Sequence, residues 1–208
     1  MMSNIGLKNI FKGSGEKCGS HIFHHAFKIF LTVALVSGLS GAVYANGYKS
    51  TLRKWTRHKQ LFNVQTLQTK IMVHATYYNP AFRKVYEEEH IKKKYLDGVK
   101  AETYIAEQEQ KQSKGDEFFV GMYVRKPYKE FSRGGESFWE AVLTTARGEE
   151  ISPIRIESVA VTPYEKVMFP YLNRWSQAYR VVFPKTDLTK PFTLTMRSVI
   201  GQTHLHWE

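Results

Sequence analysis

The amino-acid sequence predicts a mainly β protein whose domain is an antiparallel sandwich of immunoglobulin-like type. From Asp116 onward the chain holds short runs rich in β-branched and aromatic residues, and Gly and Pro signals separate them. Before them, residues 67–78 alternate with a period of two, so that Ile71, Val73 and Ala75 share one face. Short strands at this spacing are typical of such a sandwich. The six strands expected after Asp116 span residues 118–124, 138–145, 154–161, 179–183, 192–200 and 203–207.

An apolar run without charged residues precedes this domain. Residues 29–45 follow Lys28 and end on Val43 and Ala45. A basic flank, an apolar centre and a small-x-small ending are typical of an export signal. Cleavage after Ala45 is one outcome, and retention as a membrane anchor is the other, although the run is short for a membrane span. We therefore expect residues 1–45 to be an export signal or anchor helix, and the protein to lie in the bacterial cell envelope, either in the periplasm or anchored to the membrane.

The next segment, residues 46–65, is expected to form a basic amphipathic helix or linker that presents Leu52 and Trp55 on one face. Its basic residues have no acidic neighbour in the sequence. They form a solvated helix face, a contact with an anionic membrane surface, or a nucleic-acid contact. An exported protein meets lipid headgroups or envelope proteins before DNA, so nucleic acid is not the expected partner. The candidate contact residues are Lys49, Arg53, Lys54, Arg57 and Lys59.

A helical insertion over residues 80–114 is expected after the first strand of the domain, which spans residues 66–208. Asn79 is a good N-cap, and Pro80 suits the first helical position. Gly98 is expected to end the first helix, and residues 99–114 to form the second. The residues expected to lie near one stripe of the first helix are Phe82, Val85, Tyr86 and Tyr95.

The core of the sandwich can be predicted from the alternation within its strands. We expect substantial burial of Val120, Trp139, Val142, Val181, Phe183, Leu194 and Trp207.

The sequence favours no catalytic or cofactor chemistry. The only cysteine, Cys18, precedes the apolar run, so the exported part has no disulfide or thiolate metal site. Nucleotide-binding, nucleophile-elbow and metalloprotease motifs are absent from the sequence. His204 and His206 have a spacing that metal sites use, but a solvent-facing strand explains the pair equally well. We therefore expect no enzyme activity, no cofactor and no metal.

One loop is a candidate for contact with a partner. The aromatic residues around it are expected to be mostly core, with Trp175 exposed beside Tyr171. Exposed aromatic side chains on the loops of a scaffold often bind partners or glycans.

Several short words of the sequence resemble a family of uncharacterised bacterial lipoproteins. They are Ala75-Thr76-Tyr77, then Phe82 and Tyr86, and later the run YRVVFP at residues 179–184. The similarity extends over residues 51–207 and implies export and a shared fold, but no catalytic residue. Members of that family end their signal in a lipid-modified cysteine, whereas this chain has Ala45 at that place.

Together these features predict a non-catalytic exported envelope protein, an accessory or binding subunit close to the membrane. The alternative is an envelope hydrolase acting on cell-wall or glycan substrates. It would need two carboxylates, or a histidine with a carboxylate, converging on a pocket. The sequence does not indicate an oligomeric state.

Overall fold

The computed structural model describes residues 47–63, 68–124, 131, 137–186 and 188–208. The chain divides into two compact units, Met1–Ala45 and Asn46–Glu208. The expected export signal or anchor and Cys18 lie outside the described residues. Among the helices of the described part, none has the length and apolar character needed to span a membrane.

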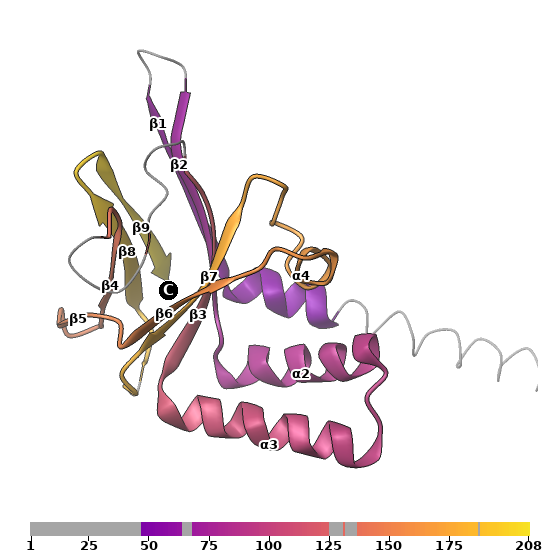
Figure 1. The fold of residues 1–208 in the computed structure, drawn as a ribbon. Coiled ribbons are helices and arrows are strands. Elements are labelled where there is room, and N and C mark those ends of the chain that lie inside the picture. The colour runs from indigo at the N-terminus through magenta and orange to yellow at the C-terminus, as the bar shows by residue number, and fades with distance from the viewer. Residues whose placement is uncertain (1–46, 64–67, 125–130, 132–136, 187) are drawn as a thin grey trace, which may run out of the picture. The chain divides into compact units, whose positions relative to one another are not determined.

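The second unit contains two antiparallel sheets. One has five strands in the order β1-β2-β3-β7-β6, and the other has four in the order β5-β4-β8-β9. Figure 1 shows the helices on one side of the five-stranded sheet and the four-stranded sheet on the other. The strands are β1 (Thr56–Asn63), β2 (Gln68–Tyr77), β3 (Asp116–Val124), β4 (Glu140–Thr144), β5 (Glu150–Ile151), β6 (Arg155–Val159), β7 (Gln177–Phe183), β8 (Phe192–Ser198) and β9 (Gly201–Trp207).

The mainly antiparallel β prediction is confirmed. A strand occurs in each of the seven places where the sequence predicts one, as β2, β3, β4, β6, β7, β8 and β9. The two strands that were not predicted are β1 and the two-residue β5, and both lie at sheet edges.

The basic helix or linker predicted over residues 46–65 is wrong over Thr56–Asn63, and residues 64 and 65 lie outside the described part. Residues 47–55 are helical, and the chain then turns into β1, which runs antiparallel to β2 along its whole length. Thr56 lies at the junction, where its hydroxyl donates to the Leu52 carbonyl oxygen at 2.7 Å. These residues form a strand and not a helix because pairing with β2 satisfies their backbone hydrogen-bonding groups and places Leu61 against the core. Most other β1 side chains are polar, which hid the strand pattern.

The helical insertion is confirmed. It consists of α2 (Pro80–Lys94) and α3 (Gly98–Lys114), placed between β2 and β3. The Asn79 side chain accepts a hydrogen bond from the Phe82 amide at 2.8 Å, as a good N-cap does. Helix α2 ends earlier than predicted, at Tyr95, which adopts a left-handed conformation with φ of 52°. Tyr95 is 91% exposed and so does not belong to the packed stripe.

The main core lies between the two sheets. Aromatic rings meet across it: Phe118 of β3 lies 5.5 Å from Trp207 of β9, and Tyr77 of β2 lies 5.2 Å from Phe192 of β8. All seven predicted core residues are buried, and six of them belong to this core. Val142 is the exception: its two neighbours in β4 belong to the core, and successive residues of a strand point to opposite faces, so Val142 faces away from it and the expected phase is wrong at this position. Burial of such large apolar side chains is the dominant favourable term in folding.

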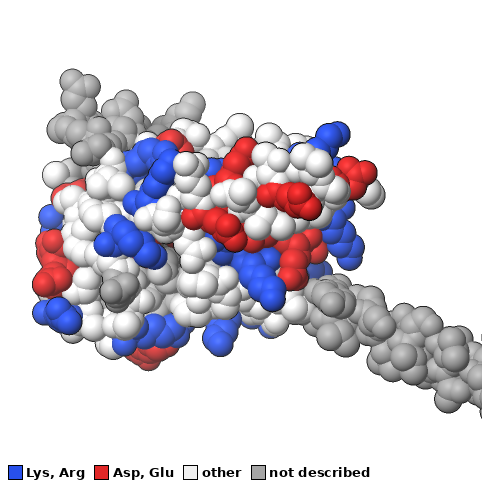
Figure 2. All heavy atoms as spheres, turned by 90° about the horizontal axis from the view of Figure 1, so that it is seen from below, with Lys and Arg blue, Asp and Glu red and all other residues white. Residues whose placement is uncertain are grey.

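A second apolar cluster lies on the outer face of the five-stranded sheet, beneath the helices. It joins Tyr48 and Leu52 of the helix of residues 47–55, which we call the first helix, to Phe82 of α2 and to Met168 of the short helix α4 (Pro163–Met168). The Tyr48 hydroxyl donates to the Met168 carbonyl oxygen at 2.7 Å, which ties the first helix to α4. By contrast, Gln108 is the only buried residue of α3. Figure 2, which shows the molecule from below the view of Figure 1, has acidic and basic side chains interspersed on its surface.

Candidate functional site

The five basic residues that the sequence predicts as a surface contact lie in different surroundings in the structure. Lys49, Arg53 and Lys54 are exposed on the helix of residues 47–55. At 100° per residue Arg53 and Lys54 lie on the side away from the buried Tyr48 and Leu52, and Lys49 lies at the flank between the two sides. Their face therefore points to solvent while the other face holds the helix on the domain. Among the described residues, no ion pair involves these three side chains.

Arg57 is not available in the same way, because its guanidinium is occupied within the fold. Its Nε donates to the His206 carbonyl oxygen at 2.7 Å, and Nη1 donates to the Lys54 and Thr56 carbonyl oxygens. The guanidinium also lies 5.8 Å from the Trp207 ring centroid. Arg57 thus connects β1 to β9, and its expected role in surface contact does not fit this arrangement.

Lys59 is exposed, but it belongs to a different surface from the three helical residues. It stands opposite Val73 in the β1–β2 ladder, and Val73 faces the main core. Side chains directly opposite each other in a ladder share a face of the sheet. The first helix packs through Tyr48 and Leu52 on the outer face instead. The basic surface therefore reduces to Lys49, Arg53 and Lys54, which we call the basic helix face.

The second predicted contact is the loop around Trp175, and hydrogen bonds within the loop hold its conformation. Trp175 is 59% exposed, and the Arg174 guanidinium lies 4.5 Å from its ring centroid. The Asn173 side chain accepts from the Trp175 amide at 2.8 Å, and the Ser176 hydroxyl accepts from the Asn173 amide at 3.1 Å. These bonds fix the turn that presents Trp175.

Tyr171, the other predicted contact, is half-buried and acts as a support for this loop. Its ring stacks on His74 at 5.0 Å, and His74 stacks on His58 at 5.5 Å. Its hydroxyl shares a hydrogen bond of 2.9 Å with Thr76. Burial lowers the pKa of His74, and the neighbouring His58 lowers it further. Trp175 is therefore the exposed contact, and Tyr171 holds the loop.

Gly121 of β3 makes room for this loop. A Cβ at this position would lie 2.6 Å from Leu172 Cδ2 and 3.0 Å from Tyr171 Cε2. We expect Gly121→Ala to reduce the free energy of unfolding by about 1–3 kcal/mol because the added methyl group overpacks the contact. Urea unfolding measures this. Gly47→Ala is the matched control, since nothing lies within 4 Å of its added Cβ. Equal unfolding free energies for Gly121→Ala and the unmodified chain would contradict close docking of the loop.

Sequence reasoning missed a buried ionic cluster beneath α2. The Glu117 carboxylate of β3 is almost fully buried and contacts two guanidinium groups. Arg83 Nη2 lies 3.1 Å from Oε2, and Arg180 Nη1 lies 2.6 Å from Oε1. Asp116 beside it accepts from the Thr186 amide and hydroxyl, each at 2.9 Å. Two adjacent acids opening an otherwise apolar strand were the available signal, because buried charges require partners.

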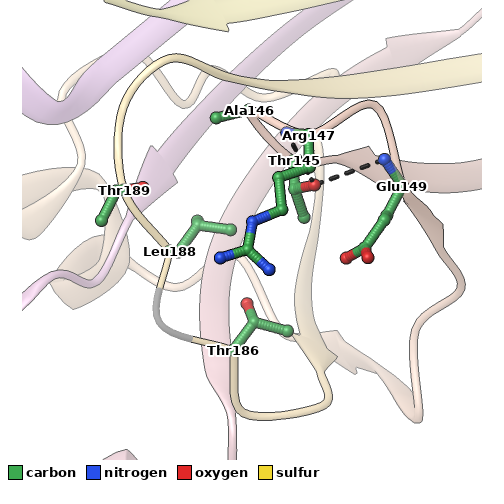
Figure 3. Close-up of a pocket in the computed structure, with 7 residues that line it drawn as sticks. All are labelled: Thr145, Ala146, Arg147, Glu149, Thr186, Leu188 and Thr189. Atoms are coloured by element: carbon green, nitrogen blue, oxygen red, sulfur yellow. Dashed lines mark hydrogen bonds between the residues drawn. The ribbon is translucent and has the colours of Figure 1, made fainter.

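The described lining residues of one pocket do not include the pair of carboxylates expected of a glycoside hydrolase. It has a volume of about 360 Å³ between the β4–β5 turn and the loop after β7. In Figure 3 the Arg147 side chain reaches into it between Leu188 and Glu149. The Thr145 hydroxyl accepts from the Arg147 and Glu149 amides at 3.3 Å and so shapes the turn. Glu149 is the single carboxylate among the described lining residues, whereas glycoside hydrolysis typically uses two.

The two histidines of β9 lie where the sequence places them. His204 and His206 are exposed on one face, while Leu205 and Trp207 are buried on the other. Within the described part of the chain, no three His, Cys, Asp or Glu side chains are grouped closely enough to hold a metal ion together.

No protein-family model, curated protein or solved structure matches this chain. The similarity of its short sequence words to bacterial lipoproteins therefore stays a prediction.

Proposed function

We propose that this protein is a non-catalytic binding protein of the bacterial cell envelope, which works close to the membrane as an accessory subunit. The observation that carries the proposal is the basic helix face. Lys49, Arg53 and Lys54 project from a helix whose other face is fixed to the domain by Tyr48 and Leu52. This helix begins within a few residues of the apolar run 29–45, the expected signal or anchor.

The position and the charge of the basic helix face both favour an anionic membrane surface as its partner. If the run 29–45 stays in the membrane, the helix of residues 47–55 is held at the level of the headgroups. Each Lys or Arg near an anionic surface then contributes about 1 kcal/mol. Since the helix is already anchored by its apolar side, little order has to be gained on binding.

We further propose that the two sheets form an immunoglobulin-like sandwich. Read as strands A, B, E and D, the segments β2, β3, β7 and β6 follow the order of one sheet of that fold. Read as C′, C, F and G, the segments β5, β4, β8 and β9 follow the order of the other. β1 is then an additional edge strand beside A, and α2 and α3 are an insertion between A and B. Such sandwiches commonly serve as binding modules of cell surfaces.

Cosedimentation of the unit Asn46–Glu208 with vesicles tests the surface contact. We expect binding to anionic vesicles, and weaker binding as salt shortens the Debye length from about 10 Å at 0.1 M to about 3 Å at 1 M. Neutralising the basic helix face with Lys49→Gln, Arg53→Gln and Lys54→Gln should weaken binding by about 3 kcal/mol, or about 100-fold.

The matched control neutralises three exposed lysines of α3, Lys100, Lys111 and Lys114. Both variants lose the same net charge, so a general electrostatic attraction would weaken equally in the two. Equal losses, or equal binding of the unmodified unit to anionic and neutral vesicles, would contradict the proposal and make the Trp175 loop the better candidate for partner contact.

A further inference from the structure

The two histidines of β9 are held side by side on an open surface. His204 and His206 project from the same face of the strand, and their ring centroids lie 6.1 Å apart with an angle of 29° between the rings. β9 is paired with β8 along its length, and Leu205 and Trp207 anchor the opposite face in the main core. The backbone that carries both imidazoles is therefore fixed.

Each ring is also oriented by a hydroxyl group of the neighbouring strand. Thr195 stands opposite His204, and Thr193 stands opposite His206. The Nδ1 atoms lie 3.0 Å and 2.9 Å from these threonine Oγ1 atoms, respectively. When Nδ1–H donates to the hydroxyl oxygen, the lone pair of each neutral ring is on Nε2. Metal-binding histidines are held in the required tautomer by hydrogen bonds of this kind.

We propose that His204 and His206 form an open binding site for a divalent late first-row transition-metal ion such as Zn²⁺. Imidazole nitrogen suits these ions and binds Zn²⁺ at about 2.0–2.1 Å. Both side chains are exposed, so an ion can reach both rings from solvent. Water or a group from a bound partner fills the other coordination positions.

The other histidines of the described part have different neighbours. His58 stacks on His74, which stacks on Tyr171 and so supports the Trp175 loop. His90 Nδ1 shares a hydrogen bond of 2.5 Å with the Tyr164 hydroxyl. Neither arrangement gives two rings that are both exposed and both held by a threonine hydroxyl. This difference selects the β9 pair.

Calorimetric titration of the full chain with zinc chloride at pH 7.5 tests the site. We expect the double variant His204→Ala/His206→Ala to bind one equivalent fewer than the unmodified chain. His58→Ala is the matched control and should keep that equivalent. Comparing variants removes any contribution of His21, His24 and His25, which all of them share. Circular dichroism and the urea midpoint establish that each variant is folded.

A further variant distinguishes an oriented site from a chance pair of histidines. Thr193→Val/Thr195→Val should weaken zinc binding about 10-fold or more, because the hydroxyls orient the rings. The same stoichiometry and affinity for the unmodified chain and the double histidine variant would overturn the proposal. An unchanged affinity in the double threonine variant would overturn the role of the hydroxyls.

Discussion

Replacing Glu117 by Ala is expected to lower the free energy of unfolding by about 3–5 kcal/mol. The carboxylate is the shared partner of two guanidinium groups, at 3.1 Å from Arg83 and 2.6 Å from Arg180. Arg83 is 2% exposed, and its Nε and Nη1 atoms have no other hydrogen-bond partner among the described residues. Removing Glu117 leaves a buried charge without compensation, which costs far more than the loss of a surface ion pair.

Urea unfolding at constant pH and salt measures this effect, and Glu89→Ala provides a matched control. Glu89 pairs with Lys93 at 3.5 Å on α2, where the Lys93 side chain is exposed and the Glu89 side chain is partly exposed. Such i,i+4 pairs contribute about 0.3–0.5 kcal/mol. The two variants thus remove the same chemical group from a buried and from an accessible pair. A loss below about 1 kcal/mol for Glu117→Ala would mean that Arg83 and Arg180 regain solvent or other partners when the carboxylate is absent.

The strands could be predicted because their alternation reflects burial directly. Ile71, Val73 and Ala75 alternate with more polar neighbours, and all three are fully buried in β2. β1 escaped prediction because it is an edge strand with few core contacts. Leu61 is the one hydrophobic side chain of its described residues that packs against the core. Backbone pairing with β2 and polar contacts such as that of Arg57 with β9 add to its stability, and they leave no hydrophobic pattern in the sequence.

The candidate site could be predicted only in part, because sequence gives residue types but not their neighbours. Lys49 and Arg57 look alike in the sequence. In the structure Lys49 is exposed, whereas Arg57 donates to the carbonyl oxygen of His206, 149 positions along the chain. Glu117 is similar, since its two partners come from α2 and β7. Long-range pairing of this kind depends on the topology, which had to be known first.

Trp139→Ala is expected to destabilise the protein by about 3–5 kcal/mol, the usual cost of truncating a fully buried tryptophan. Trp139 is 0% exposed and belongs to the core between the two sheets, directly before β4. The loss combines the transfer of the indole out of the core with the cavity that remains, because the closely packed neighbours relax only partly. The size of the loss therefore reports how rigidly the two sheets hold this position.

Urea unfolding, monitored by far-ultraviolet circular dichroism, compares the unfolding free energies of Trp139→Ala and Trp175→Ala. The two variants make the same chemical change, one in the core and one on the surface. Trp175 is exposed on its loop, so its replacement should change the unfolding free energy by no more than about 0.5 kcal/mol. A loss below about 1 kcal/mol for Trp139→Ala would contradict its place in the core, and with it the strand phase of β4. A loss as large for Trp175 would instead mean that the loop, and not only the two sheets, belongs to the cooperative folding unit.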